Sequence, residues 1–205
     1  MKIHTLFGSL AIVASTISCG AQAATGWQES TQGDLSNNGL EPSVVPVSTG
    51  SNIVTGTTGN PGTGIDRDYF TFTVPVGQQL SKIILAPDTS VSGGASFFAM
   101  QAGPQLTVSP TGAGVQNLIG FLHYTSDQFG TDILPLVHAG GPLGSGTYAA
   151  WIQELGGSVN YSFDFQLLRA PQPVPVAVGP LAPLCVVLTL LANRRPSRRR
   201  PASES

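Results

Sequence analysis

Oxygen-bearing side chains stand at alternate positions in the segment that begins at Asp34: Ser36 and Asn38 follow, and Gly39 comes next. Because a chain that wraps a hard cation turns every second residue inward, this spacing is typical of a calcium-binding loop. We therefore take Asp34, Ser36 and Asn38 as candidate calcium ligands. The alternative is an Asx-type turn that leads into Pro42, which the same residue types favour.

A complete calcium loop of this kind also needs a closing carboxylate. The twelfth position of the loop is Val45, so that ligand would have to come from Glu41, or from Asp66 and Asp68 farther along the chain. Asp66 and Asp68 flank Arg67, and the three charges equally suit a solvated strand edge that discourages edge pairing. Calcium is the one cofactor that the sequence supports.

Residues 24–170 show no motif that combines a nucleophile with an acid or base. His123 and His138 are the histidines of this segment, and neither has the spacing of a metal-binding or catalytic motif. Ser145 lies in Gly-Ser-Gly, which lacks the spacer residues of a nucleophile elbow. The segment has no cysteine for a thiolate site. We therefore expect a protein that is not an enzyme, with no catalytic residue.

Charge is distributed unevenly along the chain. Residues 24–170 carry ten acidic and three basic residues, whereas residues 193–205 carry five arginines and one glutamate. The acidic body argues against a nucleic-acid partner, because binding to phosphates needs a basic surface.

The N-terminus has the three parts of a secretory signal peptide. Lys2 precedes the apolar stretch 6–17, and small residues lead up to Ala23. We expect signal peptidase to cut between Ala23 and Ala24, which makes residues 1–23 the signal helix. A lipoprotein signal that uses Cys19 and a buried core helix are the alternatives.

The C-terminal region reads as a linker, an apolar helix and a basic tail. Residues 171–176 are rich in proline, residues 177–192 contain no charge, and residues 193–205 carry the arginines. This pattern predicts a Pro-rich linker, a short membrane helix and a cytoplasmic tail. A buried C-terminal helix is the alternative.

This arrangement resembles the PEP-CTERM sorting tails of exported Gram-negative proteins. Val174 and Pro175 match the start of the Val-Pro-Glu-Pro signature, while Val176 and Ala177 stand where that signature has Glu and Pro. The resemblance implies an exosortase-like sorting enzyme as a partner. It also implies anchorage in the inner membrane before processing, and a final place in the cell envelope, on the outer surface or outside the cell.

The segment 24–170 reads as strands between turns. Glycine and proline together make up 41 of the 205 residues, a share that disfavours helices. Alternation places Phe70, Phe72 and Val74 on one face of a strand, with 80–85 as its partner. Strands are expected at 69–74, 80–85, 148–155 and 161–167, with weaker ones at 51–56, 96–101 and 118–124; the segments 148–155 and 161–167 read as a hairpin around 156–158. We predict a single all-β sandwich, jelly-roll-like, over 24–170.

Residues 66–80 and 146–165 resemble the opening and closing strands of bacterial pre-peptidase C-terminal domains. The resemblance spans roughly residues 33–168. It implies a small, jelly-roll-like β-sandwich that binds to surfaces or acts as a spacer there. It also implies that some members hold Ca²⁺ and that the domain itself is not catalytic.

These observations favour an exported, C-terminally sorted envelope protein. We expect a structural or adhesive role in the extracellular matrix, with exopolysaccharide as a partner. The alternative is a calcium- or carbohydrate-binding module, for which Trp27 or Trp151 would have to form an exposed stacking platform. A hydrolase is the third and least supported hypothesis.

Overall fold

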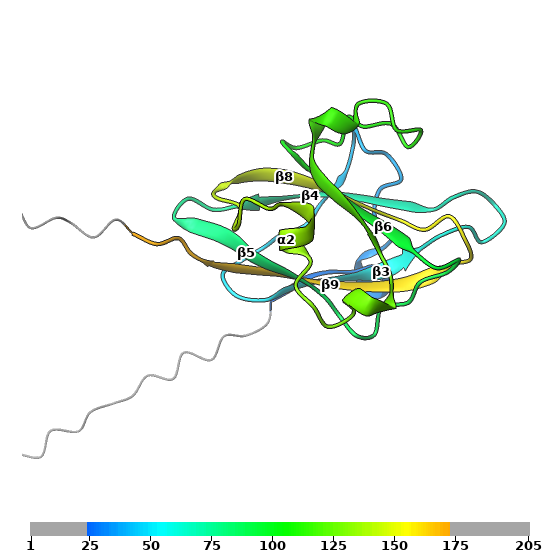
Figure 1. The fold of residues 1–205 in the computed structure, drawn as a ribbon, viewed down its shortest axis with the longest axis horizontal. Coiled ribbons are helices and arrows are strands. Elements are labelled where there is room, and N and C mark those ends of the chain that lie inside the picture. The colour runs from blue at the N-terminus through cyan, green and yellow to red at the C-terminus, as the bar shows by residue number, and fades with distance from the viewer. Residues whose placement is uncertain (1–23, 173–205) are drawn as a thin grey trace, which may run out of the picture. The chain divides into compact units, whose positions relative to one another are not determined.

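The computed structural model describes residues 24–172 (Figure 1). The expected signal helix at 1–23, the C-terminal helix at 177–192 and the basic tail at 193–205 lie outside the described residues. Within 24–172, no helix is long and apolar enough to cross a membrane.

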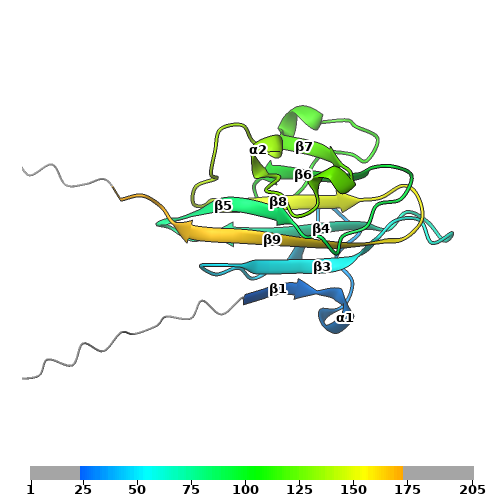
Figure 2. The ribbon, with the colours of Figure 1, turned by 60° about the horizontal axis from the view of Figure 1, so that its bottom comes forward.

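Two β-sheets form almost all of the regular structure (Figure 2). One sheet has the order β1 (Ala24–Gln28), β3 (Asn52–Thr58), β9 (Val159–Arg169) and β5 (Gln78–Leu85). The other has the order β2 (Ser43–Val44), β4 (Arg67–Val74), β8 (Gly146–Gln153), β6 (Ser96–Ala102) and β7 (Leu118–Tyr124). The prediction of an all-β, sandwich-like body is confirmed.

Aromatic side chains from both sheets fill the core. Phe70 and Phe72 of β4 and Phe165 of β9 are each 2 % exposed or less. Phe165 lies edge-on to Phe70, with ring centroids 5.6 Å apart, and 5.2 Å from Phe72. Alternation along β9 also buries Phe163 and Leu167. The inward faces predicted for these two strands are therefore correct.

The predicted strand pairings are wrong, although the strands themselves exist. β4 pairs with β8, and β5 pairs with β9, so the expected hairpin partners lie in different sheets. The same holds for β8 and β9, whose connection at 156–158 crosses from one sheet to the other. Both strands are apolar on their inward faces. When β8 and β9 lie in opposite sheets, these two faces pack against each other across the core, which buries them more fully than if the strands were neighbours in one sheet.

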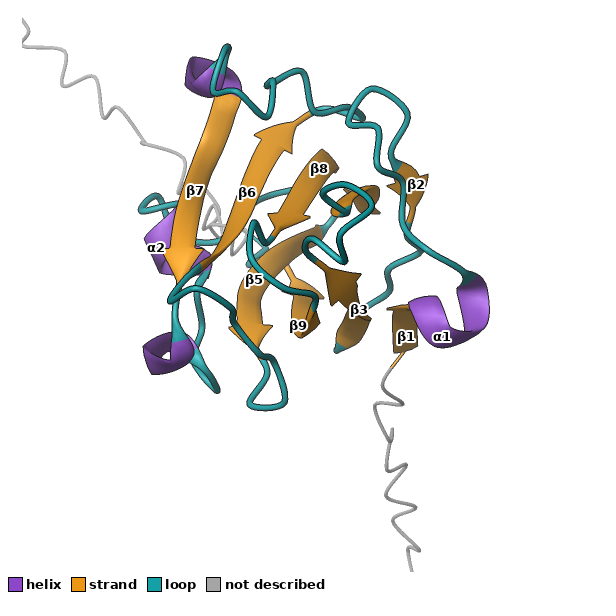
Figure 3. Ribbon diagram, turned by 90° about the vertical axis from the view of Figure 1, so that its right-hand side faces the viewer, coloured by secondary structure: helices purple, strands orange, loops and turns teal. Residues whose placement is uncertain are grey.

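Helices are few and short in the described chain (Figure 3). α1 (Glu29–Gln32) follows β1 directly, and α2 (Leu134–Val137) lies near β7. Two 3₁₀ turns, Val115–Asn117 and Ser126–Gln128, flank β7. The loop before the first of them places Leu106 and Val108 against the outer face of the five-stranded sheet.

Candidate metal centre

Three carboxylates from distant parts of the sequence meet at one end of the sandwich. Glu29 begins α1, Asp34 lies in the loop after it, and Asp68 is the second residue of β4. Each offers one oxygen, and these oxygens lie within 4.8 Å of one another. Because Glu29 follows a strand of one sheet and Asp68 belongs to the other, the cluster joins the two sheets.

Asp68 is the residue that makes this cluster unusual. It shares the inward face of β4 with Phe70 and Phe72, and its exposed fraction is 0 %. Neither carboxyl oxygen has a hydrogen-bond partner among the described residues. Burial, followed by the charges of Glu29 and neighbouring aspartates, raises the pKa of Asp68 to about 10. An ionised carboxylate in this place is costly unless a cation or a proton neutralises it.

Glu29 is held in position by donors from three segments. The backbone N–H of Thr57 donates to Oε2 at 2.8 Å, and the hydroxyl of Tyr161 donates to Oε1 at 3.0 Å. The N–H of Leu35 adds a longer bond of 3.4 Å to Oε1. Gly56 leaves room for the carboxylate, since a Cβ there would collide with Glu29 and with the Tyr161 hydroxyl. The glutamate is therefore fixed before any ligand arrives.

Asp34 lies at the exposed side of the cluster. Burial, and then the charge of Asp66, raises the pKa of Asp34 above its ordinary value. Asn37 fixes the loop to β4, because it donates to Oδ1 of Asp66 at 3.0 Å and accepts from the N–H of Arg67 at 2.7 Å. An open depression of about 770 Å³ leads to the site, and its lining includes Glu29, Asp34 and Asp66.

The chemistry of this donor set suits a hard cation. All three side chains offer oxygen, and the described chain has no cysteine to offer sulfur. Calcium binds carboxylate oxygens at about 2.3–2.6 Å in flexible geometry. Two oxygens on opposite sides of one ion can therefore be separated by up to about 5 Å, and the 4.8 Å limit found here meets that condition.

The candidate ligands taken from the sequence are divided by the structure. Asp34 belongs to the carboxylate cluster. Ser36 and Asn38 instead form local turn hydrogen bonds: the Ser36 hydroxyl accepts from the Asn38 N–H at 3.1 Å, and Asn38 Oδ1 accepts from the Leu40 N–H at 3.0 Å. These bonds are those of the alternative turn.

Glu29 was missed in the sequence, and for Asp68 the sequence allows two roles, a closing ligand and a charge at a solvated strand edge. Asp68 is buried between the sheets, so a solvated strand edge does not describe it. Its position two residues before Phe70, in phase with the inward alternation, is a sequence signal that could have revealed the burial. Glu29 carries no comparable local signal, because Thr57 and Tyr161 come to it from other strands.

The other residues considered from the sequence lie elsewhere. His123 is on β7 beside Phe97, with ring centroids 5.3 Å apart, and His138 follows α2. Trp151 is 4 % exposed, so it offers no exposed stacking platform, and Trp27 is half-buried against the core. Ser145 precedes β8.

The expected processing sites fall at or beyond the limits of the described chain. Ala24 is the first residue of β1. Ala23, Val174 and Pro175 lie outside the described residues.

Comparison with protein-family models, with curated proteins and with solved structures finds no match to this chain. Its function is therefore inferred from the carboxylate cluster and its surroundings. Within that cluster, the buried and unpaired Asp68 is the observation that most directly indicates a ligand.

Proposed function

We propose that this chain is an exported, non-catalytic envelope protein whose β-sandwich is a calcium-binding module. The observation that carries the calcium assignment is Asp68, a fully buried carboxyl that has no hydrogen-bond partner within residues 24–172 and lies beside Glu29 and Asp34. A divalent cation at this point would offset two of the three carboxylate charges and use the Asp68 oxygens that have no donor among the described residues.

The ion would have a structural role in this module. Glu29 and Asp34 belong to the segment that follows the edge strand β1, whereas Asp68 belongs to β4 in the other sheet. An ion bound to all three would tie this segment to the opposite sheet. A ligand that binds only the folded chain raises its stability, so calcium should stabilise the sandwich.

The sequence at both ends supports the export and sorting part of the proposal. Residues 1–23 have the form of a signal peptide. The segment from about 171 to 200 resembles a sorting tail with a linker, a membrane helix and basic residues. We propose signal peptidase and an exosortase-like enzyme as processing partners, and exopolysaccharide as the surface that a jelly-roll-like body would contact.

Thermal unfolding with and without calcium tests the metal site. The purified protein, stripped with a chelator, is melted in 0 to about 5 mM CaCl₂, a range chosen to cover weak extracellular calcium sites. We expect the melting temperature to rise with calcium by several degrees.

Asp68→Asn separates loss of the site from loss of the fold. It should remove the calcium response but leave a folded protein that, without calcium, is at least as stable as the natural one, because a neutral side chain replaces a buried acid. Asp127→Asn, which alters an exposed acid on a 3₁₀ turn, is the matched control and should keep the full response. An unchanged response in Asp68→Asn, or no response in the natural protein, would contradict the proposal.

A further inference from the structure

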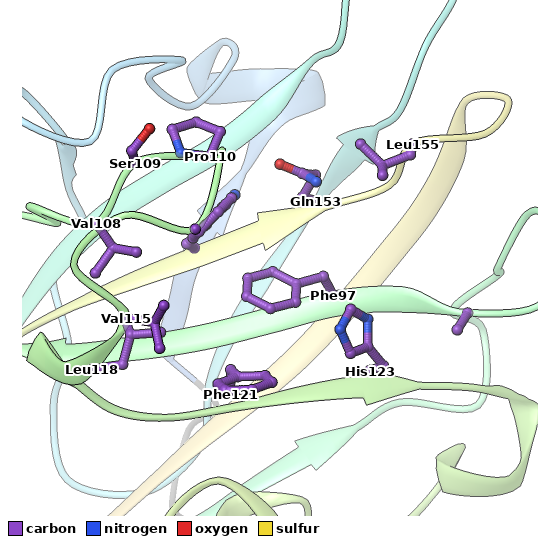
Figure 4. A pocket seen from close by; sticks show the side chains of 13 residues that line it. Phe97, Val108, Ser109, Pro110, Val115, Leu118, Phe121, His123, Gln153 and Leu155 are labelled. Atoms are coloured by element: carbon purple, nitrogen blue, oxygen red, sulfur yellow. The ribbon is translucent and has the colours of Figure 1, made fainter.

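A separate cavity opens on the outer face of the five-stranded sheet (Figure 4). It encloses about 360 Å³ between strands β6, β7 and β8 and the loop around Pro110. Phe97 and His123 lie near its centre, Val108 and Val115 gather at one end, and Leu155 lies at the other. None of its lining residues belongs to the carboxylate cluster.

Aromatic rings form the floor of the cavity. Phe97 meets Trp151 edge to face, with ring centroids 4.7 Å apart, and lies nearly parallel to Phe121 at 5.9 Å. These three side chains come from three adjacent strands of one sheet. A flat ring that enters the cavity would find both ring faces and ring edges, which are the two arrangements that aromatic pairs favour.

The rim of the cavity is apolar and exposed. Val115, Phe121 and Leu155 are 46 %, 49 % and 62 % exposed, and all three border this opening. They belong to a small set of large apolar side chains on the surface of the described chain. Isolated apolar side chains are common on protein surfaces, but these three surround one concave site.

The lining is mostly apolar and includes one histidine, His123. It contains no Asp, Glu, Lys or Arg, although the body of the protein is acidic. Its polar side chains are already engaged in part: Oε1 of Gln153 accepts from Arg67 at 2.6 Å, and the Ser109 hydroxyl shares a hydrogen bond with Thr111. Such a lining favours a neutral ligand. It offers too few free donors and acceptors for a sugar with many hydroxyls.

Trp151 contributes its ring to the floor of the cavity. Its indole Nε1 is buried and has no acceptor among the described residues, while the residue lines the cavity. Because the protein covers that nitrogen, a ligand in the cavity would meet the ring and not the N–H. The other indole differs, since Trp27 donates to the Gly33 carbonyl at 3.0 Å.

We propose that this cavity binds a small neutral aromatic compound of one or two rings. The ring would pack among Phe97, Phe121 and the edge of Trp151 that lines the cavity. The volume lies at the lower end of the range for small-molecule sites. This activity is independent of calcium, so failure of one proposal leaves the other standing.

Nuclear magnetic resonance of the two indole N–H groups tests the proposal on ¹⁵N-labelled protein without any variant of the cavity. The probes are acetophenone and ethylbenzene as one-ring aromatic compounds, and methyl glucoside as the sugar. Trp27→Phe assigns the two signals. Both aromatic probes should move the Trp151 signal in a saturable way, because a ring bound beside the indole changes its magnetic environment, while methyl glucoside leaves the signal unchanged.

Two exposed-site variants complete the test. Phe121→Ala should weaken acetophenone binding about three- to tenfold, because it removes one stacking ring. Leu168→Ala removes an apolar side chain of similar exposure, 52 % against 49 %, from β9 in the other sheet, and should change nothing. Saturable movement caused by methyl glucoside, or no movement with either aromatic probe, would overturn the proposal.

Discussion

The hydroxyl of Tyr161 donates a 3.0 Å hydrogen bond to Oε1 of Glu29, across 132 positions of sequence. This bond links the last strand, β9, to the first turn of helix after β1. It also holds the glutamate within 4.8 Å of Asp68, whose carboxyl oxygens have no donor in the part of the chain that the structure describes. The carboxylate cluster thus depends on contacts that only the complete sandwich provides.

Calcium binding should release about one proton per ion at pH 7. The pKa of Asp68 is raised to about 10 by burial and by the charges of Glu29 and nearby aspartates, so the metal-free carboxyl is protonated at neutral pH. Calorimetric titration in two buffers of different ionisation enthalpy measures the release. Binding heats that do not depend on the buffer would contradict it.

The stability of the metal-free protein should fall as the pH rises. The folded-state pKa of Asp68 lies above its unfolded value of 3.8, so the stabilisation from the proton is complete below pH 3.8 and declines as the pH rises toward 10. Urea unfolding in the presence of a chelator, at pH 6 and pH 9, gives the trend. Asp68→Asn should flatten it, and an equal slope in the variant would assign the trend to other groups.

Replacing Gly56 by alanine should weaken calcium binding about tenfold or more. The added Cβ would collide with the Glu29 carboxylate and the Tyr161 hydroxyl, and outer-shell disturbances of this kind commonly cost ten- to a hundredfold in metal affinity. Gly144→Ala is the control, because open space surrounds that position. Calorimetric titration measures the calcium affinity of both variants. Equal affinities in Gly56→Ala and Gly144→Ala would show that calcium binding does not need Glu29.

Glu154 should make the fold sensitive to acid independently of calcium. Burial raises its pKa, but hydrogen bonds from Ser96, Gly156, Ser92 and Leu155 outweigh this and leave the pKa below its ordinary value. The carboxylate therefore contributes stability above pH 4.5, which is lost as the pH falls through the lowered folded-state pKa. Glu154→Gln should cost about 2 kcal/mol at pH 7 and less at pH 3.5, as measured by urea unfolding. A cost that stays constant with pH would argue against this role.

Phe165 should be among the most sensitive positions of the core. It lies within 6.4 Å, centroid to centroid, of Phe70, Phe72 and Phe98 and is 1 % exposed. Phe165→Ala should lower the free energy of unfolding by about 4 kcal/mol, because it leaves a cavity between the sheets. Leu168→Ala on the same strand, 52 % exposed, should change it by less than about 0.5 kcal/mol. Urea unfolding of both proteins makes the comparison.

Intact-mass measurement on protein recovered from a Gram-negative host tests both expected processing events. Loss of residues 1–23 would place the mature N-terminus at Ala24, and Ala23→Asp should block that cut, because signal peptidase needs a small residue there. A second cut between residues 173 and 177 would show sorting despite Val176. Recovery of the full chain would argue against export, and loss of the N-terminal segment alone would indicate an anchored protein.

The sequence predicted strands better than it predicted which strands pair. Alternation in β4 and β9 shows which side of each strand is apolar, and those faces are correct. It does not indicate the neighbouring strand, which is why 156–158 read as a hairpin turn while the chain in fact crosses between sheets.

For the candidate site, too, the local sequence pattern identified only part of what the fold brings together. Asp34 was found from local spacing and Asp68 was named as one possible closing carboxylate, whereas Glu29 becomes a ligand candidate only when distant strands meet. The short strands β1 and β2 were also missed, because they pair in parallel with segments far along the chain.

The order of strands has a consequence for how the chain acquires its shape. β8 lies between β4 and β6, and β9 lies between β3 and β5, so the two last strands of the described chain occupy the centre of their sheets. A ribosome or a translocation pore releases these strands after all their neighbours. Neither sheet can close before residues 146–169 emerge, and closure then joins distant segments, which slows folding. Residues 24–170 would therefore remain unfolded enough to pass through a narrow pore until the last two strands have passed.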